Sequence, residues 1–231
     1  MSETDLCGLH NPFWASLATR HARIAQGGAL ARRYPPQVSV LAGLSGSTPE
    51  HVAALTSLVA AGDDVALVGT QVPELSSDWE TLYASELTQM LRHERSPLPE
   101  GGMEVATLGR ADVPEMQALV ELTHPGPFRA RTIELGTYVG IRDRGRLVAM
   151  AGERTWIGDF REVSAVCTHP EAQGRGYARM LIGRVVNRML CAGRTPFLHA
   201  ETRNEVAIEV YRRLGFVRRT RLPLVYARKI G

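Results

Sequence analysis

The stretch that decides the fold runs from residue 169 to residue 178 and reads His169-Pro170-Glu171-Ala172-Gln173-Gly174-Arg175-Gly176-Tyr177-Ala178. It follows a predicted strand, Phe160 to Thr168, and it precedes a predicted helix with apolar residues Ala178, Leu181, Ile182, Val185 and Met189 along one face. A strand, a turn of small residues and an amphipathic helix together present unpaired N-terminal amides to an anion. Gly174 and Gly176 let the backbone approach a phosphate without a Cβ, and Arg175 adds a positive charge. The stretch therefore predicts a pyrophosphate-binding turn.

The motif of this turn resembles that of a known family. It lacks the Gly-Lys-Ser/Thr ending of a P-loop and the full Gly-x-Gly-x-x-Gly fingerprint of dinucleotide-binding proteins. Residues 173–178, Gln-Gly-Arg-Gly-Tyr-Ala, are similar to the Gln/Arg-x-x-Gly-x-Gly/Ala signature of the GNAT superfamily of acetyl-CoA-dependent N-acyltransferases. Asn204, Tyr211 and Leu214-Gly215-Phe216 resemble the second block of that family, and the resemblance covers the chain from about residue 101 onward.

The resemblance implies an α+β fold, with a central mixed, mostly antiparallel sheet flanked by helices. Two prolines and two glycines between Ser96 and Gly102 indicate a domain boundary. We therefore expect a GNAT-like acyltransferase domain over residues 101–231 and a small N-terminal α/β module over residues 1–100, of unknown role. In the N-terminal module the pattern predicts a helix at 48–61, a strand at 64–69 and a second helix at Trp79–Arg92.

Downstream of the boundary, hydrophobic patterns and turn residues predict the order of the elements. We expect a strand at 103–108, a helix at 112–122 capped by Asp112, a hairpin of strands 137–141 and 146–154, and a strand at 197–201. Asn204 should cap a helix that ends at Gly215. Two final strands, Phe216–Arg219 and Leu222–Arg228, should be separated at Pro223 or just before it.

The family resemblance also implies where acetyl-CoA, as co-substrate, would bind. The strand before the turn should diverge from the strand at 197–201 and open a V for the pantetheine arm. The backbones of Val166, Cys167 and Thr168 would pair with that arm, and the Val166 amide would hold the thioester carbonyl. The remaining cofactor-binding residues would be Gln173, Gly174, Arg175, Gly176, Tyr177, Ala178 and Asn204, and no metal is implied.

Two side chains are candidates for proton transfer. Tyr211 matches the position at which many GNAT enzymes keep a tyrosine that protonates the departing thiolate, although a core tyrosine with a bonded hydroxyl is the alternative. Glu162 matches the offset of the general base in the histone acetyltransferase branch, and strand alternation places it on one face with Ser164, Val166 and Thr168. A surface glutamate is the alternative there, and Glu153 is the second candidate for the base.

Three other sequence features bear on the reaction type and on the acceptor site. Cys167 with His169 superficially suggests a thiol hydrolase, but Pro170 should carry His169 away from the sheet. The rigid loop His124–Phe128 would border the acceptor site by the same family resemblance. Asn11-Pro12-Phe13-Trp14 fits a buried start better than an apolar lid.

Composition excludes several classes of protein. The chain has 231 residues and a net charge of +3, and Lys229 is its single lysine beside 26 arginines, a bias that does not resemble a DNA-binding surface. It shows no signal peptide and no membrane span, and its three cysteines suit neither a disulfide framework nor a zinc site, so a cytoplasmic location is expected. We expect a monomeric or homodimeric N-acetyltransferase with a small-molecule or peptide amine acceptor. The alternative is a non-catalytic acyl-CoA-binding or sensing module.

Overall fold

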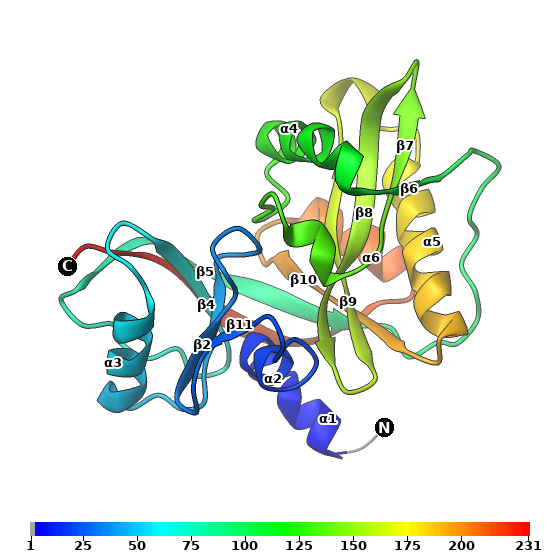
Figure 1. The fold of residues 1–231 in the computed structure, drawn as a ribbon. Helices are drawn as coiled ribbons and strands as arrows, with labels where there is room; N and C mark the ends of the chain where they lie inside the picture. Colours follow the sequence, from blue (N-terminus) through cyan, green and yellow to red (C-terminus); the bar gives the residue numbers. More distant parts are fainter. Residues whose placement is uncertain (1–2) are drawn as a thin grey trace.

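The structure is a computed structural model that describes residues 3–231 (Figure 1). Its α-helices are α1 (Glu3–Gly8), α2 (Pro12–Ala18), α3 (Pro49–Leu58), α4 (Val113–Thr123), α5 (Tyr177–Cys191) and α6 (Glu205–Arg213). Its strands are β1 (Gln26–Gly27), β2 (Ala31–Arg33), β3 (Leu41–Leu44), β4 (Asp64–Val68), β5 (Trp79–Leu91), β6 (Ala106–Leu108), β7 (Tyr138–Asp143), β8 (Arg146–Ile157), β9 (Phe160–Thr168), β10 (Thr195–Glu201) and β11 (Val217–Lys229). Short 3₁₀ turns lie at Arg110–Asp112, Thr132–Leu135 and Pro170–Ala172.

The strands of the described residues 3–231 form one mixed sheet in the order β1-β2-β3-β4-β11-β5-β10-β9-β8-β7-β6. The pairs β3–β4 and β9–β10 are parallel, and every other neighbouring pair is antiparallel. Helices α4 and α5 cover opposite faces of the β7–β9 region (Figure 1). The expected α+β architecture, a mostly antiparallel sheet flanked by helices, is therefore confirmed.

Most of the predicted elements after residue 100 are present. Strands β7 and β8 form the expected hairpin, β9 runs to Thr168, and α5 follows the glycine turn. Helix α5 buries Leu181, Ile182, Val185 and Met189, as its amphipathic pattern predicts. The first helix of this half, α4, begins directly after Asp112. The prediction that the Asp112 side chain caps it is wrong, because this carboxylate accepts from the Gly109 amide at 2.7 Å instead.

The predicted helix at Trp79–Arg92 is wrong, because this segment forms strand β5. Its leucines, glutamates and glutamine favour a helix locally. However, both edges of β5 are hydrogen-bonded, to β10 on one side and to β11 on the other. The ladder with β11 runs along the whole strand and that with β10 covers Leu87–Leu91. These ladders outweigh a weak local preference, so tertiary pairing decides the conformation here.

The predicted break near Pro223 is also wrong, because β11 continues from Val217 to Lys229. A β-bulge between Arg218 and Thr220 bends this strand without ending it. The Pro223 carbonyl accepts a hydrogen bond from the Gly69 amide, one residue beyond the end of β4. The N–H that Pro223 lacks would point toward β4 at the position where the β4–β11 ladder ends. Its absence therefore removes no hydrogen bond from the ladder.

Strands β9 and β10 separate after a short contact. Their parallel pairing spans Thr195–Phe197 and Phe160–Glu162 alone, whereas the rest of β10 continues to pair with β5 up to Glu201. The expected V between the two strands is therefore present.

A β-bulge in β9 interrupts the alternation on which one prediction relied. Ala165 has a φ of 51°, and the β8–β9 register shifts beside it. Val163 and Val166 pack in the cluster beneath α5, whereas Ala165 and Cys167 pack in the cluster beneath α4. The expectation that residues 162, 164, 166 and 168 share one face is thus wrong.

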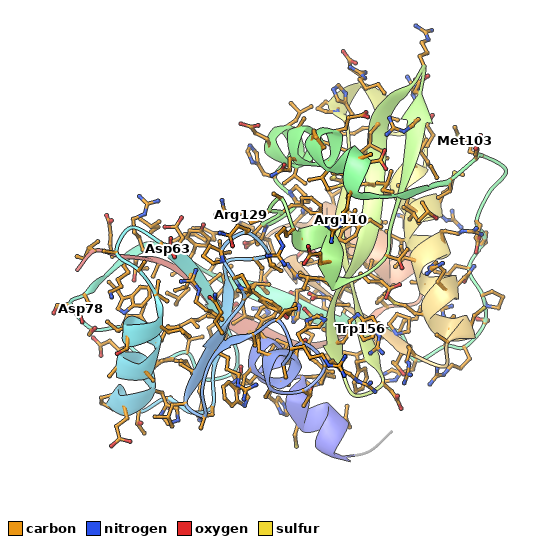
Figure 2. The ribbon with its side chains drawn as sticks, viewed as in Figure 1. Asp63, Asp78, Met103, Arg110, Arg129 and Trp156 are labelled. Carbon is orange, nitrogen blue, oxygen red and sulfur yellow. The ribbon has the colours of Figure 1, made fainter. Side chains whose placement is uncertain are left out.

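The sheet is continuous across the predicted domain boundary at residues 96–102. Strand β5 precedes this segment, yet it lies between β10 and β11 of the second half. Helix α2 packs against both β3 and β8, so it also connects the two halves. At the far end of β8, the Trp156 amide donates to Ser16 Oγ of α2 at 3.3 Å, and Figure 2 shows Trp156 beside that helix.

Candidate active site

The glycine turn before α5 is open to a ligand. Gly174 and Gly176 adopt left-handed φ values of 77° and 79°, and a Cβ added at either position would meet open space. Gly176 is the N-cap of α5 and provides no side-chain cap, and the first turn of the helix carries no acidic residue. The backbone amides of residues 176–179 donate to no protein acceptor in the part of the chain that the structure describes. The turn therefore fits an anion such as the pyrophosphate of CoA.

The side chains of the turn are arranged around this opening. Gln173 and Arg175 are exposed, Tyr177 is buried and Ala178 is half-buried. Arg175 pairs with Asp143 at 3.3 Å and donates to the Glu171 carbonyl at 3.2 Å. These contacts keep its charge beside the turn.

A cavity of about 340 Å³ lies at the opening between β9 and β10. The second half of the chain contributes Val166, Ala200, Asn204, Ala207 and Tyr211 to its wall, together with residues 124–127 of the predicted loop His124–Phe128. The first half contributes an apolar wall of Phe13, Leu41, Ala66, Val68 and Leu87, and Leu224 of β11 adjoins it. Residues 1–100 therefore help to build the cavity that contains the predicted catalytic tyrosine.

Tyr211 is half-buried in this cavity wall. Its ring packs against Phe216 in an edge-to-face contact, with 6.1 Å between centroids. Burial, helped by Cys167, raises the pKa of Tyr211 to about 12. Its hydroxyl forms no hydrogen bond with another residue in the described range 3–231. The phenol is therefore protonated at neutral pH, and its proton is not engaged elsewhere.

The other predicted cofactor contacts lie around the same opening. Asn204 caps α6, because its side-chain oxygen accepts from the Ala207 amide at 3.0 Å. Val166 lines the cavity, and Cys167 is buried beneath α4. The Thr168 hydroxyl is buried and has no hydrogen-bond partner among residues 3–231. A buried hydroxyl without a hydrogen-bond partner is energetically costly unless a ligand or a water molecule binds it. The position of Thr168 therefore suits a strand that hydrogen-bonds to the polar pantetheine arm.

Glu162 is fully buried, and it does not line the cavity. Arg154 donates to both of its oxygens, at 3.0 and 2.6 Å. His199 Nδ1 lies 2.7 Å from the same carboxylate, which can only accept, so this nitrogen donates. Burial alone would raise the pKa of Glu162, but Arg154 and His199 hold it well below its usual range. Arg154 and His199, the two partners of Glu162, line the cavity instead of Glu162. Its role as the base stays a prediction.

Glu153 faces away from this network. The positive charges of Arg188 and Arg161 partly offset the effect of burial on the pKa of its carboxyl. Burial raises the pKa of the Glu153 carboxyl. It does not line the cavity.

His199 and Glu201 of β10 both line the cavity, and neither was predicted from the sequence as a site residue. Glu201 Oε2 accepts from Ser85 at 2.9 Å and Oε1 accepts from the Tyr83 hydroxyl at 3.2 Å, and Arg203 lies 3.9 Å away. The signal was available, because polar residues at every second position of the strand 197–201 share one face.

Cys167 and His169 do not form a catalytic pair. Burial raises the pKa of the Cys167 thiol to about 11. His169 Nδ1 instead accepts from the Glu171 amide at 3.2 Å, within the turn after β9. A protonated thiol without a nearby base is a poor nucleophile, which leaves the thiol-hydrolase alternative without support.

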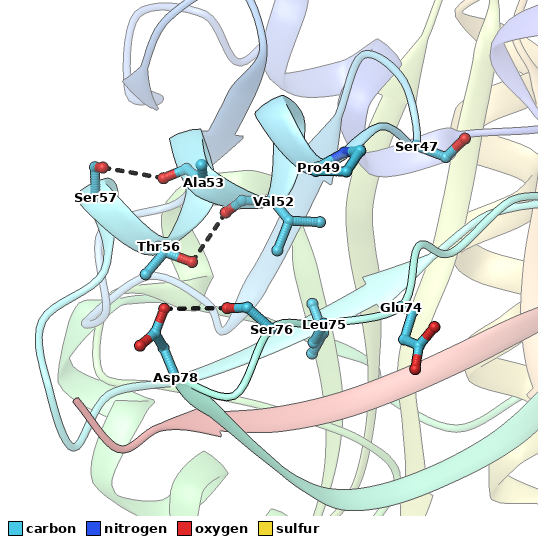
Figure 3. A pocket seen from close by; sticks show the side chains of 10 residues that line it. All are labelled: Ser47, Pro49, Val52, Ala53, Thr56, Ser57, Glu74, Leu75, Ser76 and Asp78. Atoms are coloured by element: carbon cyan, nitrogen blue, oxygen red, sulfur yellow. Dashed lines mark hydrogen bonds between the residues drawn. The ribbon is translucent and has the colours of Figure 1, made fainter.

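A second hollow, of about 600 Å³, lies between α3 and the segment that precedes β5 (Figure 3). Its hydroxyl groups serve local structure. Thr56 donates to the Val52 carbonyl at 2.9 Å, Ser57 to the Ala53 carbonyl at 3.0 Å, and Ser76 to Asp78 at 3.1 Å. None of the predicted site residues lines this hollow.

The described residues 3–231 also bear on metal binding and on membrane spans. Within this range, no three His, Cys, Asp or Glu side chains are grouped in a way that could hold a metal ion. No helix in the same range combines the length and the apolar character needed to cross a membrane.

Comparisons with known proteins agree with this geometry. Residues 138–223 match the family model described as FR47-like protein. The N-alpha-acetyltransferase RimI of Mycobacterium tuberculosis is 32% identical over 133 residues, which cover 54% of this chain and 82% of the relative.

Two solved structures extend the likeness to the N-terminal half. A GNAT-family acetyltransferase structure from Novosphingobium aromaticivorans is 34% identical and has a TM-score of 0.86, covering 96% of this chain and 98% of that one. A GCN5-related N-acetyltransferase from Kribbella flavida, 15% identical with a TM-score of 0.63, covers 100% of this chain and 97% of its own and shares the fold. By its relatives and its fold, the chain belongs to the GNAT superfamily of acetyl-CoA-dependent N-acetyltransferases.

Proposed function

We propose that the protein transfers the acetyl group of acetyl-CoA directly to a primary amine, with both substrates bound in the cavity between β9 and β10. One observation carries the proposal: Val166 of β9 and Tyr211 of α6 line the same cavity, where the two strands separate. Acetyl-CoA supplies an activated thioester. The open amides of residues 176–179 would hold its pyrophosphate.

The residues of this chain would divide the chemistry between them. The amine nitrogen forms a bond to the thioester carbon, and the Val166 amide stabilises the oxygen on which negative charge develops. As the carbon–sulfur bond breaks, Tyr211 donates its proton to the leaving thiolate. Because a phenol with a pKa of about 12 stays protonated at neutral pH, the donor is always loaded before attack.

The sequence predicts Glu162 as the base, with Glu153 as the second candidate, but neither lines the cavity. In their place we propose Glu201 as the group that takes the proton from the attacking amine. Its carboxylate lines the cavity, whereas Glu162 lies behind Arg154 and His199. Both Glu201 oxygens accept from hydroxyl groups, so the side chain is held in place while it retains lone pairs for the amine. The amine acceptor would then bind next to Glu201, against the apolar cavity wall that residues 1–100 contribute.

The test is CoA release from acetyl-CoA with a panel of primary amines, measured for the wild type and for Glu201→Gln. We expect release with at least one amine and a fall in kcat of about tenfold or more in the variant. Glu86→Gln is the matched control, because Glu86 is an exposed carboxylate of β5 outside the cavity. Equal loss in both variants would contradict the Glu201 assignment. Acetyl-CoA binding without release for any amine would show a non-catalytic acyl-CoA-binding protein instead.

The role of residues 1–100, the cellular location and the oligomeric state are the remaining predictions. We propose that residues 1–100 act as the acceptor-side module of the 101–231 catalytic domain, since five of their apolar side chains line the cavity. Cytoplasmic location and a monomeric or homodimeric state remain expectations from the sequence.

A further inference from the structure

Arg154 of β8 lies in the cavity wall with one edge of its guanidinium free. Its Nε and Nη2 atoms are bound to Glu162 at 3.0 and 2.6 Å, and Phe13 covers the guanidinium, whose central carbon lies 5.5 Å from the ring centroid. Nη1 has no hydrogen-bond partner within residues 3–231. Since Arg154 lines the cavity, this nitrogen can donate to an oxygen of a bound molecule.

A row of hydrogen-bonded side chains fixes Arg154 in this orientation. His199 donates to Glu162 at 2.7 Å, and its second nitrogen accepts from the Gln89 amide at 3.0 Å. The Gln89 oxygen in turn accepts from Arg219 at 3.0 Å. The row crosses five neighbouring strands, β8, β9, β10, β5 and β11. Arg154 cannot turn away without breaking this network, so its free edge is preorganised for a ligand.

The charges of the cavity favour a neutral oxygen over a carboxylate. Among the lining residues, Arg154 is the arginine and Glu201 the carboxylate. The Arg154 charge is already matched by Glu162 behind it. Glu201 accepts from two hydroxyls, and the exposed Arg203 lies 3.9 Å from it and donates to the Tyr83 hydroxyl at 2.6 Å. Because Arg203 is exposed, solvent screens its charge, and it offsets the negative charge of Glu201 only weakly. A bound carboxylate would add a second negative charge to this half-enclosed space, whereas an amine would be attracted.

We propose that Arg154 determines the acceptor by binding a neutral carbonyl oxygen on the carbon next to the attacked amine. The acceptors are then α-amino amides, either free amino-acid amides or the N-terminal ends of peptides. The apolar wall of Leu41, Val68, Leu87 and Leu224 would take an apolar side chain. This inference rests on the proposed acetyl transfer and specifies its substrate.

Three matched amines test the proposal on the wild-type protein: phenylalanine amide, phenylalanine and phenethylamine. They share the aromatic side chain and differ in the group next to the amine. The three amines differ in basicity, so kcat/KM is expressed per concentration of unprotonated amine. On that basis we expect kcat/KM for the amide to exceed that of each of the others by at least about tenfold, the effect of one hydrogen bond to a charged donor. Equal use of phenethylamine, or a preference for free phenylalanine, would overturn the proposal. Absence of CoA release with every amine would instead refute the proposed function. Comparing the amide with a Phe-Gly-Gly-Gly peptide tells a free amide from a peptide end.

Arg154→Lys tests the residue itself. A lysine keeps the charge that Glu162 needs, but it loses the rigid fork that directs a second edge into the cavity. We expect KM for phenylalanine amide to rise at least about tenfold with a smaller change in kcat, and the preference for the amide to shrink. Arg161→Lys is the control, because Arg161 is a buried arginine of β9 that stacks on Trp156 outside the cavity. An unchanged amide preference in a folded Arg154→Lys protein would contradict the assignment. If this variant does not fold, the substrate series decides alone.

Discussion

The Tyr211 hydroxyl is the residue-scale feature on which the chemistry depends. Replacing Tyr211 with Phe keeps the ring contact with Phe216 but removes the proton. We expect kcat to fall by roughly 10²-fold, because the donor acts where charge develops on sulfur, while the affinity for acetyl-CoA barely changes. Turnover and calorimetric affinity should be measured on the same preparation.

Thermal stability separates this role from a structural one. The hydroxyl has no hydrogen bond to lose among the described residues, so the melting temperature of Tyr211→Phe should match the wild type. Normal turnover with a lowered melting temperature would identify Tyr211 as a core residue instead.

His21 gives the fold a pH dependence. Its ring is buried and lies 2.7 Å from the Tyr34 hydroxyl. Burial, reinforced by the positive charge of Arg161, lowers the pKa of His21 to about 4. The unfolded chain, with a His pKa near 6.5, binds more protons between these values, so stability falls as pH drops through this window. We expect the free energy of unfolding to decrease by about 2 kcal/mol between pH 7 and pH 5 from this group.

Denaturant unfolding at the two pH values checks this expectation. His21→Asn keeps a hydrogen-bond acceptor for Tyr34 and removes the titration, so it should flatten the pH dependence. His93→Asn, at an exposed position, should leave the wild-type slope intact. Identical slopes in all three proteins would show that His21 is not the source.

Among the site residues, the sequence predicts those that belong to its two motifs, the glycine turn and the block from Asn204 to Phe216. Gly174, Gly176, Asn204 and Tyr211 occupy the expected elements because local patterns and motif spacing place them. Arg154, His199 and Glu201 come together through pairing between strands that are distant in the sequence. One residue inserted at the Ala165 bulge also redirects the side chains that follow it, and alternation alone does not reveal such an insertion.

The helix–turn element makes a separate prediction. Gly176→Val places a β-branched residue at a φ of 79° beside the open amides. We expect the dissociation constant for acetyl-CoA to rise at least about tenfold, because the side chain crowds the anion and strains the turn. Calorimetry gives this constant directly.

Gly193→Val is the matched control at the other end of the same helix. Gly193 has a φ of 72°, and a Cβ there would also meet open space. Both variants therefore carry similar backbone strain, while Gly193 lies away from the turn. Equal loss of acetyl-CoA affinity in the two variants would mean that strain, and not the turn, causes the effect.

Elements whose identity depends on partners were predicted least well. Strand β5 has the composition of a helix, and it becomes extended because β10 and β11 occupy both of its edges. Helix α5, in contrast, carries a strong amphipathic pattern and a glycine turn, so its position follows from local information. Pro223 indicates a break when it is considered alone, but it is accommodated where β4 ends.

At the scale of the whole molecule, the two halves share one sheet. Strand β5 of the first half separates β10 from β11 of the second. A fragment of residues 101–231 would lose this strand and leave unpaired edges on both neighbours. We expect the fragment to show no cooperative thermal unfolding.

Cleavage of the folded chain provides the control for this fragment. The segment 101–104 is exposed, so a cut there removes a covalent link and leaves the sheet complete. The cleaved protein should keep a cooperative transition. Cooperative unfolding of the isolated 101–231 fragment, with acetyl-CoA binding, would instead show an independent domain.

Transfer of the acetyl group to an amine is the central claim for the molecule as a whole. The most direct test uses acetyl-CoA labelled with ¹³C in the acetyl group, with product analysis by mass spectrometry and parallel measurement of free CoA. We expect labelled amide on the amine acceptor in equal amount to the CoA released, with little labelled acetate. Labelled acetate in place of the amide would show hydrolysis, and neither product across the amine panel would show that the protein binds acetyl-CoA without using it.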